Sequence, residues 1–195
     1  KNDGHKYLNE VFKKRASIAI VEKIKKNIGH TKQIKVKDTL KFLTDCSRIY
    51  RESLRTKIIA VTGSCGKTSL KDMLGFVLSK NYQTTYSKKS FNNKYGVPLS
   101  LLNINQKDKF GVIEVGMDKK GEIDFLSKIV KPDIGVITNI SFAHIKNFKN
   151  ILGIAAAKGE IINNINPHGS IILNADDKFY NFHKKLAFKK KIKVF

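Results

Sequence analysis

The residues best suited to chemistry form a glycine-rich stretch from Lys57 to Ser69, KIIAVTGSCGKTS. Its apolar, β-branched run 58–61 predicts a buried strand, and the pattern after Gly66 predicts a helix. A strand, a glycine turn and a helix start form the context of a phosphate-binding loop, because glycine lets backbone N–H groups turn inward and a helix N-terminus attracts anions. The predicted nucleotide-binding residues are Thr62, Gly63, Ser64, Cys65, Gly66, Lys67, Thr68 and Ser69.

Lys67 and Thr68 carry the predicted chemistry of this loop. The Lys67 ammonium would reach the β- and γ-phosphates of ATP, and the Thr68 hydroxyl would be a ligand of Mg²⁺. The loop departs from the commonest form, because Val61 stands where the first glycine is usual. A glycine turn that merely joins a strand to a helix is the alternative. The order Gly-Lys-Thr after an apolar strand favours a nucleotide triphosphate site.

Two further candidates follow later strands. Glu114 lies in the apolar run 110–116, where a carboxylate is costly unless it is paired or bound to a metal. The carboxyl end of a strand beside a phosphate loop suits a Mg²⁺ ligand, and a carboxylate facing solvent is the alternative. His144 follows the strand predicted over 133–140, which is also a usual place for a site. Taken alone, His144 fits an ordinary loop histidine better than a site residue.

Lys158 is the third candidate, and it shares the apolar face of the helix predicted over 151–162. A desolvated lysine has a lowered pKa. A neutral amine can react with CO₂ to form a carbamate, which is an anionic metal ligand. The alternative is a lysine whose stem runs along the helix edge so that its ammonium reaches water. The residues alone favour this alternative.

Polar residues in two loops are candidate ligand contacts. Asn92 and Asn93 lie in the polar loop 87–96, either as turn formers or as contacts to substrate or phosphate. Asn174 and Asp176 follow the strand predicted over 169–173, either as a helix cap or as a turn that contacts the nucleoside.

These candidates need a fold that gathers strand ends at one edge. Strands alternate with helices along the chain, which predicts a mostly parallel, three-layer α/β sheet. Residues 1–55 predict the end of a preceding, smaller α/β domain, and residues 56–195 predict the nucleotide-binding domain. The chain does not begin with Met and stops inside a predicted strand, so we interpret it as a piece of a longer protein.

The composition bears on partners and location. The chain has 195 residues, and its 38 Lys and Arg against 16 Asp and Glu give a formal charge of +22. Such a charge can mark a nucleic-acid surface, but the lysines are spread along the whole chain, so we expect no nucleic-acid partner. No apolar run approaches the ~20 residues of a membrane span, and no signal peptide is evident, so we expect no membrane insertion. Two cysteines without ligand spacing fit a cytoplasmic protein, and we expect a monomer.

Several segments in a fixed order resemble the Mur ligase family, over residues 57–177 and more weakly over 1–55. The segments are T-G-S-C-G-K-T-S, S-F-N-N-K-Y-G-V-P-L-S-L-L, V-I-E-V-G-M-D-K-K-G-E-I, T-N-I-S-F-A-H-I, A-A-A-K-G-E-I-I and L-N-A-D-D. They resemble the ATP-binding central domain, and residues 1–55 resemble the end of the N-terminal, uridine-nucleotide-binding domain. Two patterns, N-N-x-x-G-V-P and E-x-G-x-x-x-x-G-E-I, are most similar to members that add D-alanyl-D-alanine to UDP-N-acetylmuramoyl-tripeptide.

The resemblance implies an ATP-dependent amide ligase of peptidoglycan precursor synthesis that works through an acyl phosphate. It implies that Lys67 stabilises the transferring phosphoryl group, with Thr68 and Glu114 on a first Mg²⁺. It places His144 and a carbamylated Lys158 on a second metal, and so favours the carbamate over the solvent-reaching lysine. Asn92 and Asn93 match the substrate-loop asparagines of the family. The C-terminal domain of the family has no counterpart here, so we expect this fragment alone to be inactive.

Three other functions compete with this interpretation. The nearest is another ligase of the same build that adds a different amino acid, or a folylpolyglutamate-synthase-like ligase. A basic P-loop ATPase acting on nucleic acid is suggested by charge alone. A non-catalytic nucleotide-binding module is disfavoured by Glu114 and Lys158, because simple binding needs neither residue.

Overall fold

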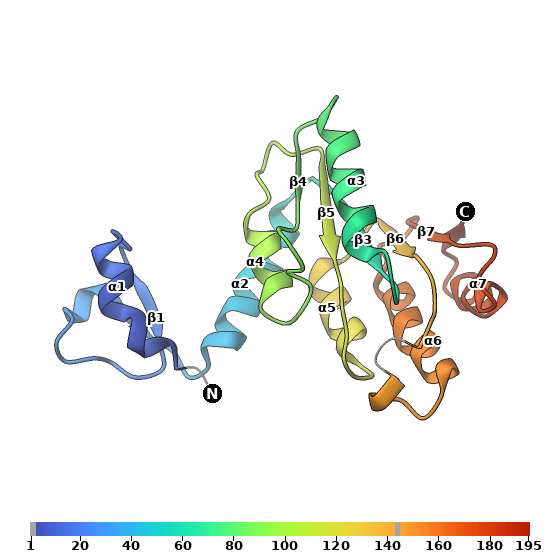
Figure 1. The fold of residues 1–195 in the computed structure, drawn as a ribbon. Coiled ribbons are helices and arrows are strands. Elements are labelled where there is room, and N and C mark those ends of the chain that lie inside the picture. Colours follow the sequence, from blue (N-terminus) through green and yellow to red (C-terminus); the bar gives the residue numbers. More distant parts are fainter. Residues whose placement is uncertain (1–2, 143–144) are drawn as a thin grey trace. The chain divides into compact units, whose positions relative to one another are not determined.

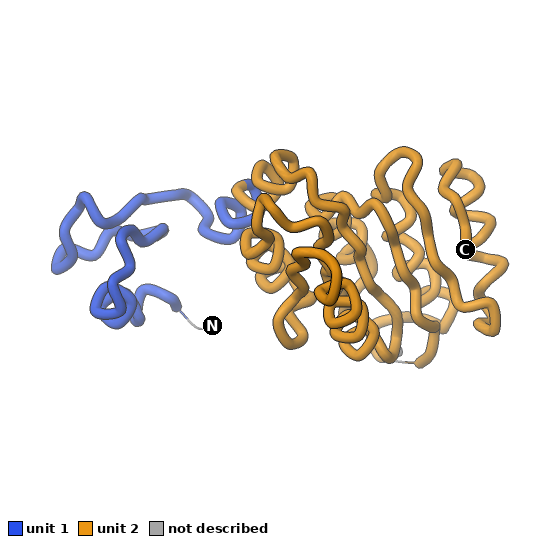
Figure 2. Tube along the Cα trace, turned by 90° about the horizontal axis from the view of Figure 1, so that it is seen from above, with its two compact units in different colours: residues 1–45 blue, residues 46–195 orange. Residues whose placement is uncertain are grey.

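The computed structural model describes residues 3–142 and 145–195, and the chain divides into two compact units, 1–45 and 46–195 (Figure 2). The division falls inside helix α2 (Thr39–Ser53), whereas the sequence predicted a domain boundary after residue 55. The structural division falls earlier because the last turns of α2 pack with the second unit, a contact between distant residues that the sequence pattern does not show. The assignment of the first unit to a substrate-binding domain stays a prediction.

The first unit is small and contains two parallel strands. Its core consists of Leu8, Val21 and Ile28. The elements are η1 (Gly4–Tyr7), α1 (Leu8–Lys13), β1 (Ala19–Val21), η2 (His30–Lys32) and β2 (Gln33–Lys35), and β1 pairs with β2.

The second unit is built on a six-stranded sheet in which every neighbouring pair is parallel (Figure 1). The strand order is β4-β5-β3-β6-β7-β8. The strands are β3 (Lys57–Thr62), β4 (Thr84–Tyr86), β5 (Phe110–Glu114), β6 (Ile134–Ile137), β7 (Ser170–Leu173) and β8 (Lys193–Val194). The predicted parallel sheet is confirmed, and the strand before the glycine loop lies between β5 and β6.

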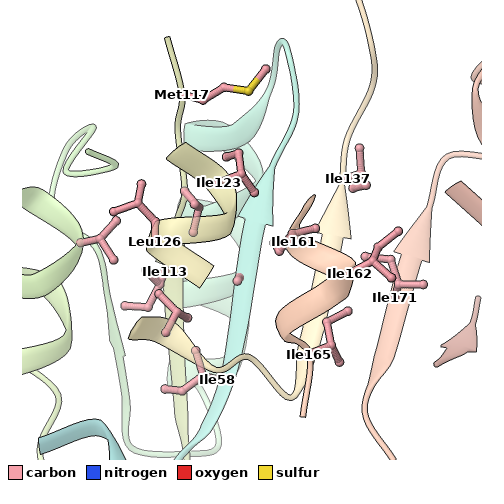
Figure 3. Packing of buried hydrophobic residues seen from close by; sticks show 14 of the residues in the cluster. Ile58, Ile113, Met117, Ile123, Leu126, Ile137, Ile161, Ile162, Ile165 and Ile171 are labelled. Atoms are coloured by element: carbon pink, nitrogen blue, oxygen red, sulfur yellow. The ribbon is translucent and has the colours of Figure 1, made fainter. Parts of the chain in front are cut away.

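Helices cover both faces of this sheet, as its alternating buried side chains require. On one face α3 (Lys67–Ser79) packs on Ile59 and Val61 of β3. On the other face Ile58 and Ala60 of the same strand join a large cluster with the remaining helices (Figure 3). These elements are α4 (Gly96–Leu102), α5 (Glu122–Val130), α6 (Ile151–Gly159), η4 (Glu160–Asn164) and α7 (Tyr180–Lys189). A short helix, η3 (Ile145–Asn147), precedes α6. The three-layer prediction is confirmed. None of the helices within the described ranges is long and apolar enough to cross a membrane.

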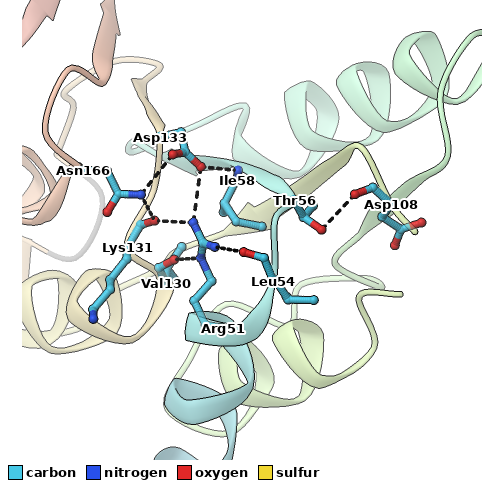
Figure 4. Close-up of polar contacts among 9 residues, drawn as sticks. All are labelled: Arg51, Leu54, Thr56, Ile58, Asp108, Val130, Lys131, Asp133 and Asn166. Carbon is cyan, nitrogen blue, oxygen red and sulfur yellow. Dashed lines mark hydrogen bonds and ion pairs between the residues drawn. The ribbon is translucent and has the colours of Figure 1, made fainter. Parts of the chain in front are cut away.

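A buried arginine joins the last turns of α2 to the amino ends of the central strands (Figure 4). Arg51 Nε donates to the Val130 carbonyl at 2.8 Å, and Nη2 donates to the Lys131 carbonyl at 2.8 Å. Nη2 also contacts Asp133 Oδ2 at 3.3 Å. The same carboxylate oxygen accepts a hydrogen bond from the Ile58 N–H at 2.8 Å. One guanidinium therefore holds α2, the end of α5 and the starts of β3 and β6 together.

We expect Arg51→Met to lower the free energy of unfolding by about 2 kcal/mol, because it removes a buried cation that donates to the Val130 and Lys131 carbonyls and pairs with the Asp133 carboxylate. Urea unfolding of the two proteins measures this difference. Arg48→Met on the same helix is the control: the Arg48 side chain is half-exposed and lies 3.6 Å from Glu52, so its loss should cost under ~1 kcal/mol. Equal losses in the two variants would contradict the role given to Arg51.

Candidate active site

The glycine loop has the strand–turn–helix geometry that the sequence predicted. It leaves β3 at the buried Thr62 and enters α3 at Lys67, and Ser69 is exposed on the first turn of α3. Gly63 and Gly66 have φ angles of 145° and 79°, which residues with a Cβ rarely adopt. A Cβ on Gly63 would also collide with the Thr138 hydroxyl. Glycine is therefore required at the first of these turns for space as well as for conformation.

Residues 138–141, which follow β6, hold the glycine loop through hydrogen bonds. The Ser64 N–H donates to the Asn139 carbonyl at 2.9 Å, and the Cys65 N–H donates to Asn139 Oδ1 at 3.1 Å. The Thr138 hydroxyl donates to the Cys65 carbonyl at 2.6 Å, and the Ser141 N–H donates to Ser64 Oγ at 2.8 Å. These contacts were not predicted, because they depend on β6 being the neighbour of β3.

Glu114 lies against the loop, as predicted, because β5 pairs with β3 in a register that sets Glu114 opposite Val61. Its side chain is buried, with 1% of the residue exposed, so the solvent-facing alternative is wrong. Oε2 accepts a hydrogen bond from the Thr68 hydroxyl at 2.8 Å, and Oε1 accepts one from Asn92 Nδ2 at 2.7 Å. The two carboxylate oxygens thus join the start of α3 to residues 87–95, which we call the asparagine loop.

Two lysines converge on a single carbonyl of the loop. Lys67 Nζ and Lys158 Nζ each donate to the Gly63 carbonyl at 2.8 Å. Only 1% of Lys158 is exposed, so the alternative of a solvent-reaching lysine is wrong. Burial, assisted by the positive charge of Lys67, lowers the pKa of Lys158 to about 7, and Cys65 acts in the opposite direction. A large fraction of the Lys158 amine is therefore neutral near pH 7.

The two loop asparagines have different structural roles. Asn92 holds Glu114, and its backbone carbonyl accepts a hydrogen bond from the Gly116 N–H at 2.8 Å. Asn93 Oδ1 accepts from the N–H groups of Tyr95 and Gly96 at 3.0 Å each, which caps the start of α4. Both asparagines also line the cavity described below. Their contacts to substrate stay a prediction.

Two further predicted site residues follow β7. Asn174 and Asp176 are exposed after β7, where Asn174 Oδ1 accepts the Asp176 N–H at 3.0 Å in a turn. Their predicted contact with the nucleoside stays a prediction, and His144 lies outside the described residues. Asp177 was missed: its Oδ2 accepts the Ile140 N–H at 2.6 Å and so supports the segment that holds the glycine loop.

A cavity of about 420 Å³ opens beside Lys67 and Lys158. Its other walls come from the loop 92–95, the segment 116–118 and the first turns of α5. Apolar side chains of Met117, Phe125 and Leu126 line it together with charged ones. The two lysines in its lining suit an anionic group, and the mixed walls suit a ligand with polar and apolar parts.

The parallel sheet and the glycine loop between β3 and α3 define a P-loop α/β protein. Within that class, the model of the Mur ligase middle domain matches residues 61–195. The chain belongs to the Mur ligase family, and the resemblance found in the sequence is confirmed.

Individual relatives are similar along nearly the whole chain. The UDP-N-acetylmuramoyl-tripeptide–D-alanyl-D-alanine ligase of Buchnera aphidicola subsp. Acyrthosiphon pisum is 39% identical over 186 residues, which are 95% of this chain and 40% of that protein. The crystal structure of MurF from Acinetobacter baumannii matches with a TM-score of 0.88 at 36% identity, over 99% of this chain and 42% of that one. MurF from Thermotoga maritima in complex with ADP matches with a TM-score of 0.83 at 26% identity, over 98% and 44%. The chain thus spans about 40% of the length of these relatives.

The lowered pKa of Lys158 predicts a pH-dependent stability. Between pH 7 and 10.5 the folded chain binds fewer protons at this lysine than the unfolded chain does, so the free energy of unfolding should rise with pH in that window. Lys158→Met removes the titrating group. Relative to this variant, the wild-type chain should gain roughly 2–4 kcal/mol between pH 7 and pH 10.

Urea unfolding of both chains in CO₂-free buffer measures this gain, since the many other lysines titrate alike in the two proteins. A difference between the two chains that stays constant with pH would mean that Lys158 keeps its proton in the fold.

Proposed function

We propose that the whole protein is an ATP-dependent amide ligase that joins D-alanyl-D-alanine to UDP-N-acetylmuramoyl-tripeptide in peptidoglycan precursor synthesis. The relatives that carry this name support the choice of substrates. The structural observation that supports it best is the convergence of Lys67 and Lys158 on the Gly63 carbonyl, where both lysines line the cavity and Thr68, next to Lys67, bonds Glu114. A site for nucleotide binding alone needs neither the buried lysine nor the cavity.

ATP would bind with its phosphates on the loop 62–69 and at the start of α3. The N-terminus of α3 favours anions there. Lys67 already lies at the loop through the Gly63 carbonyl, and a γ-phosphate would offer it a stronger, charged acceptor. Asn174 and Asp176, at the carboxyl end of β7, would contact the nucleoside. The ADP complex of the Thermotoga maritima relative supports the choice of nucleotide.

Thr68 and Glu114 fit a Mg²⁺ ion, because a hydroxyl and a carboxylate supply the oxygen ligands that this ion prefers alongside phosphate and water. Their oxygens are 2.8 Å apart, on the side of the loop where phosphates would lie. The phosphates of the nucleotide and water would supply the other oxygen ligands of the ion. When bound, Mg²⁺ would supply positive charge that offsets the charge of the phosphates.

Lys158 would serve as a carbamate. Its neutral amine nitrogen would form a bond to the carbon of CO₂ and release a proton, leaving an anionic N-carboxylate. Its pKa near 7 makes the neutral amine available, and its neighbour Lys67 favours an anion over a second cation. We propose that this carbamate, together with His144, is a ligand of a second Mg²⁺.

The cavity would hold the peptide end of the muramoyl substrate, with Asn92 and Asn93 at its wall. The terminal carboxylate of the tripeptide would attack the γ-phosphorus, so that a new O–P bond forms and the bond to ADP breaks. The amine of D-alanyl-D-alanine would then attack the acyl phosphate carbon, forming the amide and releasing phosphate. Lys67 would stabilise the charge on the transferring phosphoryl group.

The test is phosphate release by the full-length protein with ATP, UDP-N-acetylmuramoyl-tripeptide and D-alanyl-D-alanine. We expect release to depend on both substrates, and Lys67→Ala to reduce it by at least about a hundredfold without changing the circular dichroism spectrum. Lys57→Ala, at the exposed start of the same strand, is the control and should be near normal.

Two results would count against the proposal. Wild-type protein that releases no phosphate in response to the dipeptide would contradict the function. Normal turnover by Lys67→Ala would contradict the assignment of the loop.

A further inference from the structure

Besides Lys158, a second lysine is buried, and it lies on α3. It has no part in the reaction described above. Lys71 lies one helical turn after Lys67 and is fully buried. An ammonium has three donors, and Lys71 Nζ directs them to Asp72 Oδ1 at 2.6 Å, the Ser87 carbonyl at 2.8 Å and the Lys89 carbonyl at 3.2 Å. A buried charge is costly unless it is paired in this way. Two of its three acceptors are main-chain atoms at the start of the asparagine loop.

The asparagine loop, residues 87–95, is thereby tied to the site at two places. At its start, Lys71 holds two carbonyls, and Ser87 Oγ accepts the Glu114 N–H at 3.1 Å. Further along, Asn92 Nδ2 donates to the Glu114 carboxylate at 2.7 Å. The loop therefore depends on α3 through Lys71 as well as on β5 through Glu114.

The backbone of the loop needs such a tie. Lys89 has a φ of 49°, in the left-handed region that few residues other than glycine adopt. Such a conformation persists only when its surroundings hold it. The Lys89 carbonyl is one of the two that the Lys71 ammonium binds, so the ammonium stabilises the turn at the strained residue.

A close approach of α3 to β4 brings the ammonium within reach of these carbonyls. One turn beyond Lys71, a Cβ on Gly75 would collide with the ring of Tyr86. The Lys71 ammonium itself lies 5.8 Å from the centre of the same ring. The missing side chain at Gly75 thus lets the end of β4, and the loop that follows it, lie against α3.

We propose that Lys71 is a positioning residue that fixes the asparagine loop, and through it Asn92 and Asn93, at the wall of the cavity. It acts through the main chain of the loop, because its buried ammonium is bound to the protein alone. This role rests on the proposed function, in which the cavity takes the muramoyl peptide. Loss of the tether should weaken binding of that substrate and leave the phosphate loop intact.

The test compares Lys71→Met with wild type in the full-length protein. We expect KM for UDP-N-acetylmuramoyl-tripeptide to rise about tenfold or more, because charged hydrogen bonds to the loop are lost, while KM for ATP stays within about threefold. Lys80→Met, at the exposed C-terminal end of α3, is the control and should change neither constant. Combined with Asn92→Ala, the effect of Lys71→Met should be less than additive, since both act through one loop.

Trypsin cleavage supplies a readout that does not need ligase activity. Lys88, Lys89 and Lys94 lie in the loop, and they should be cut faster in Lys71→Met than in wild type or Lys80→Met. Faster cleavage in a protein without ligase activity would support the tether and reject the proposed function. Equal cleavage together with unchanged KM values would overturn the tether, and so would an equal rise of both KM values.

Lys71→Arg covers the case in which Lys71→Met does not fold. It keeps the positive charge but cannot place a compact ammonium between the two carbonyls. It should therefore raise the same KM and speed the same cleavage. Wild-type values of both in the arginine variant would overturn the proposal.

Discussion

The site depends on the burial of one carboxylate. Glu114 is 1% exposed at the end of a central strand, where an unpaired charge would be strongly unfavourable. The carboxylate is stabilised by the Thr68 hydroxyl and the Asn92 amide, which donate to its two oxygens. The start of α3 and the asparagine loop must therefore both come to β5. The pairing of β5 with β3, and not any feature of the glycine loop itself, sets where this junction forms.

Two lysine ammonium groups meet at the glycine loop. Lys67 and Lys158 share the Gly63 carbonyl, and their mutual repulsion adds to the effect of burial in lowering the pKa of Lys158. An anion between the two lysines would relieve that repulsion, whether it is a phosphate of the nucleotide or a carbamate on Lys158 itself. The same electrostatic arrangement thus underlies the two proposed roles of this side of the site.

The sequence predicted the features that depend on local patterns. Apolar strands alternating with amphipathic helices predicted the parallel sheet. For Lys158 the residues alone favoured a stem that reaches water, and this was wrong, because the helix face that carries the lysine is covered by the rest of the fold. Two features escaped because they depend on which strands are neighbours. Asn139 can accept hydrogen bonds from the glycine loop only because β6 is the neighbour of β3. Lys71 is buried because β4 lies close to α3. In the sequence, Lys71 is one of many lysines and nothing local sets it apart.

The proposed role of Glu114 as the carboxylate that holds Mg²⁺ at the nucleotide can be measured by calorimetry. Binding of ATP to the full-length protein is compared with and without Mg²⁺, in wild type and in Glu114→Gln. The glutamine keeps the size of the side chain but removes the negative charge that the ion requires. We expect the variant to lose most of the gain in ATP affinity that Mg²⁺ gives wild type, while its affinity without Mg²⁺ stays similar. If Mg²⁺ raises the affinity of the variant as much as that of wild type, Glu114 does not hold the ion.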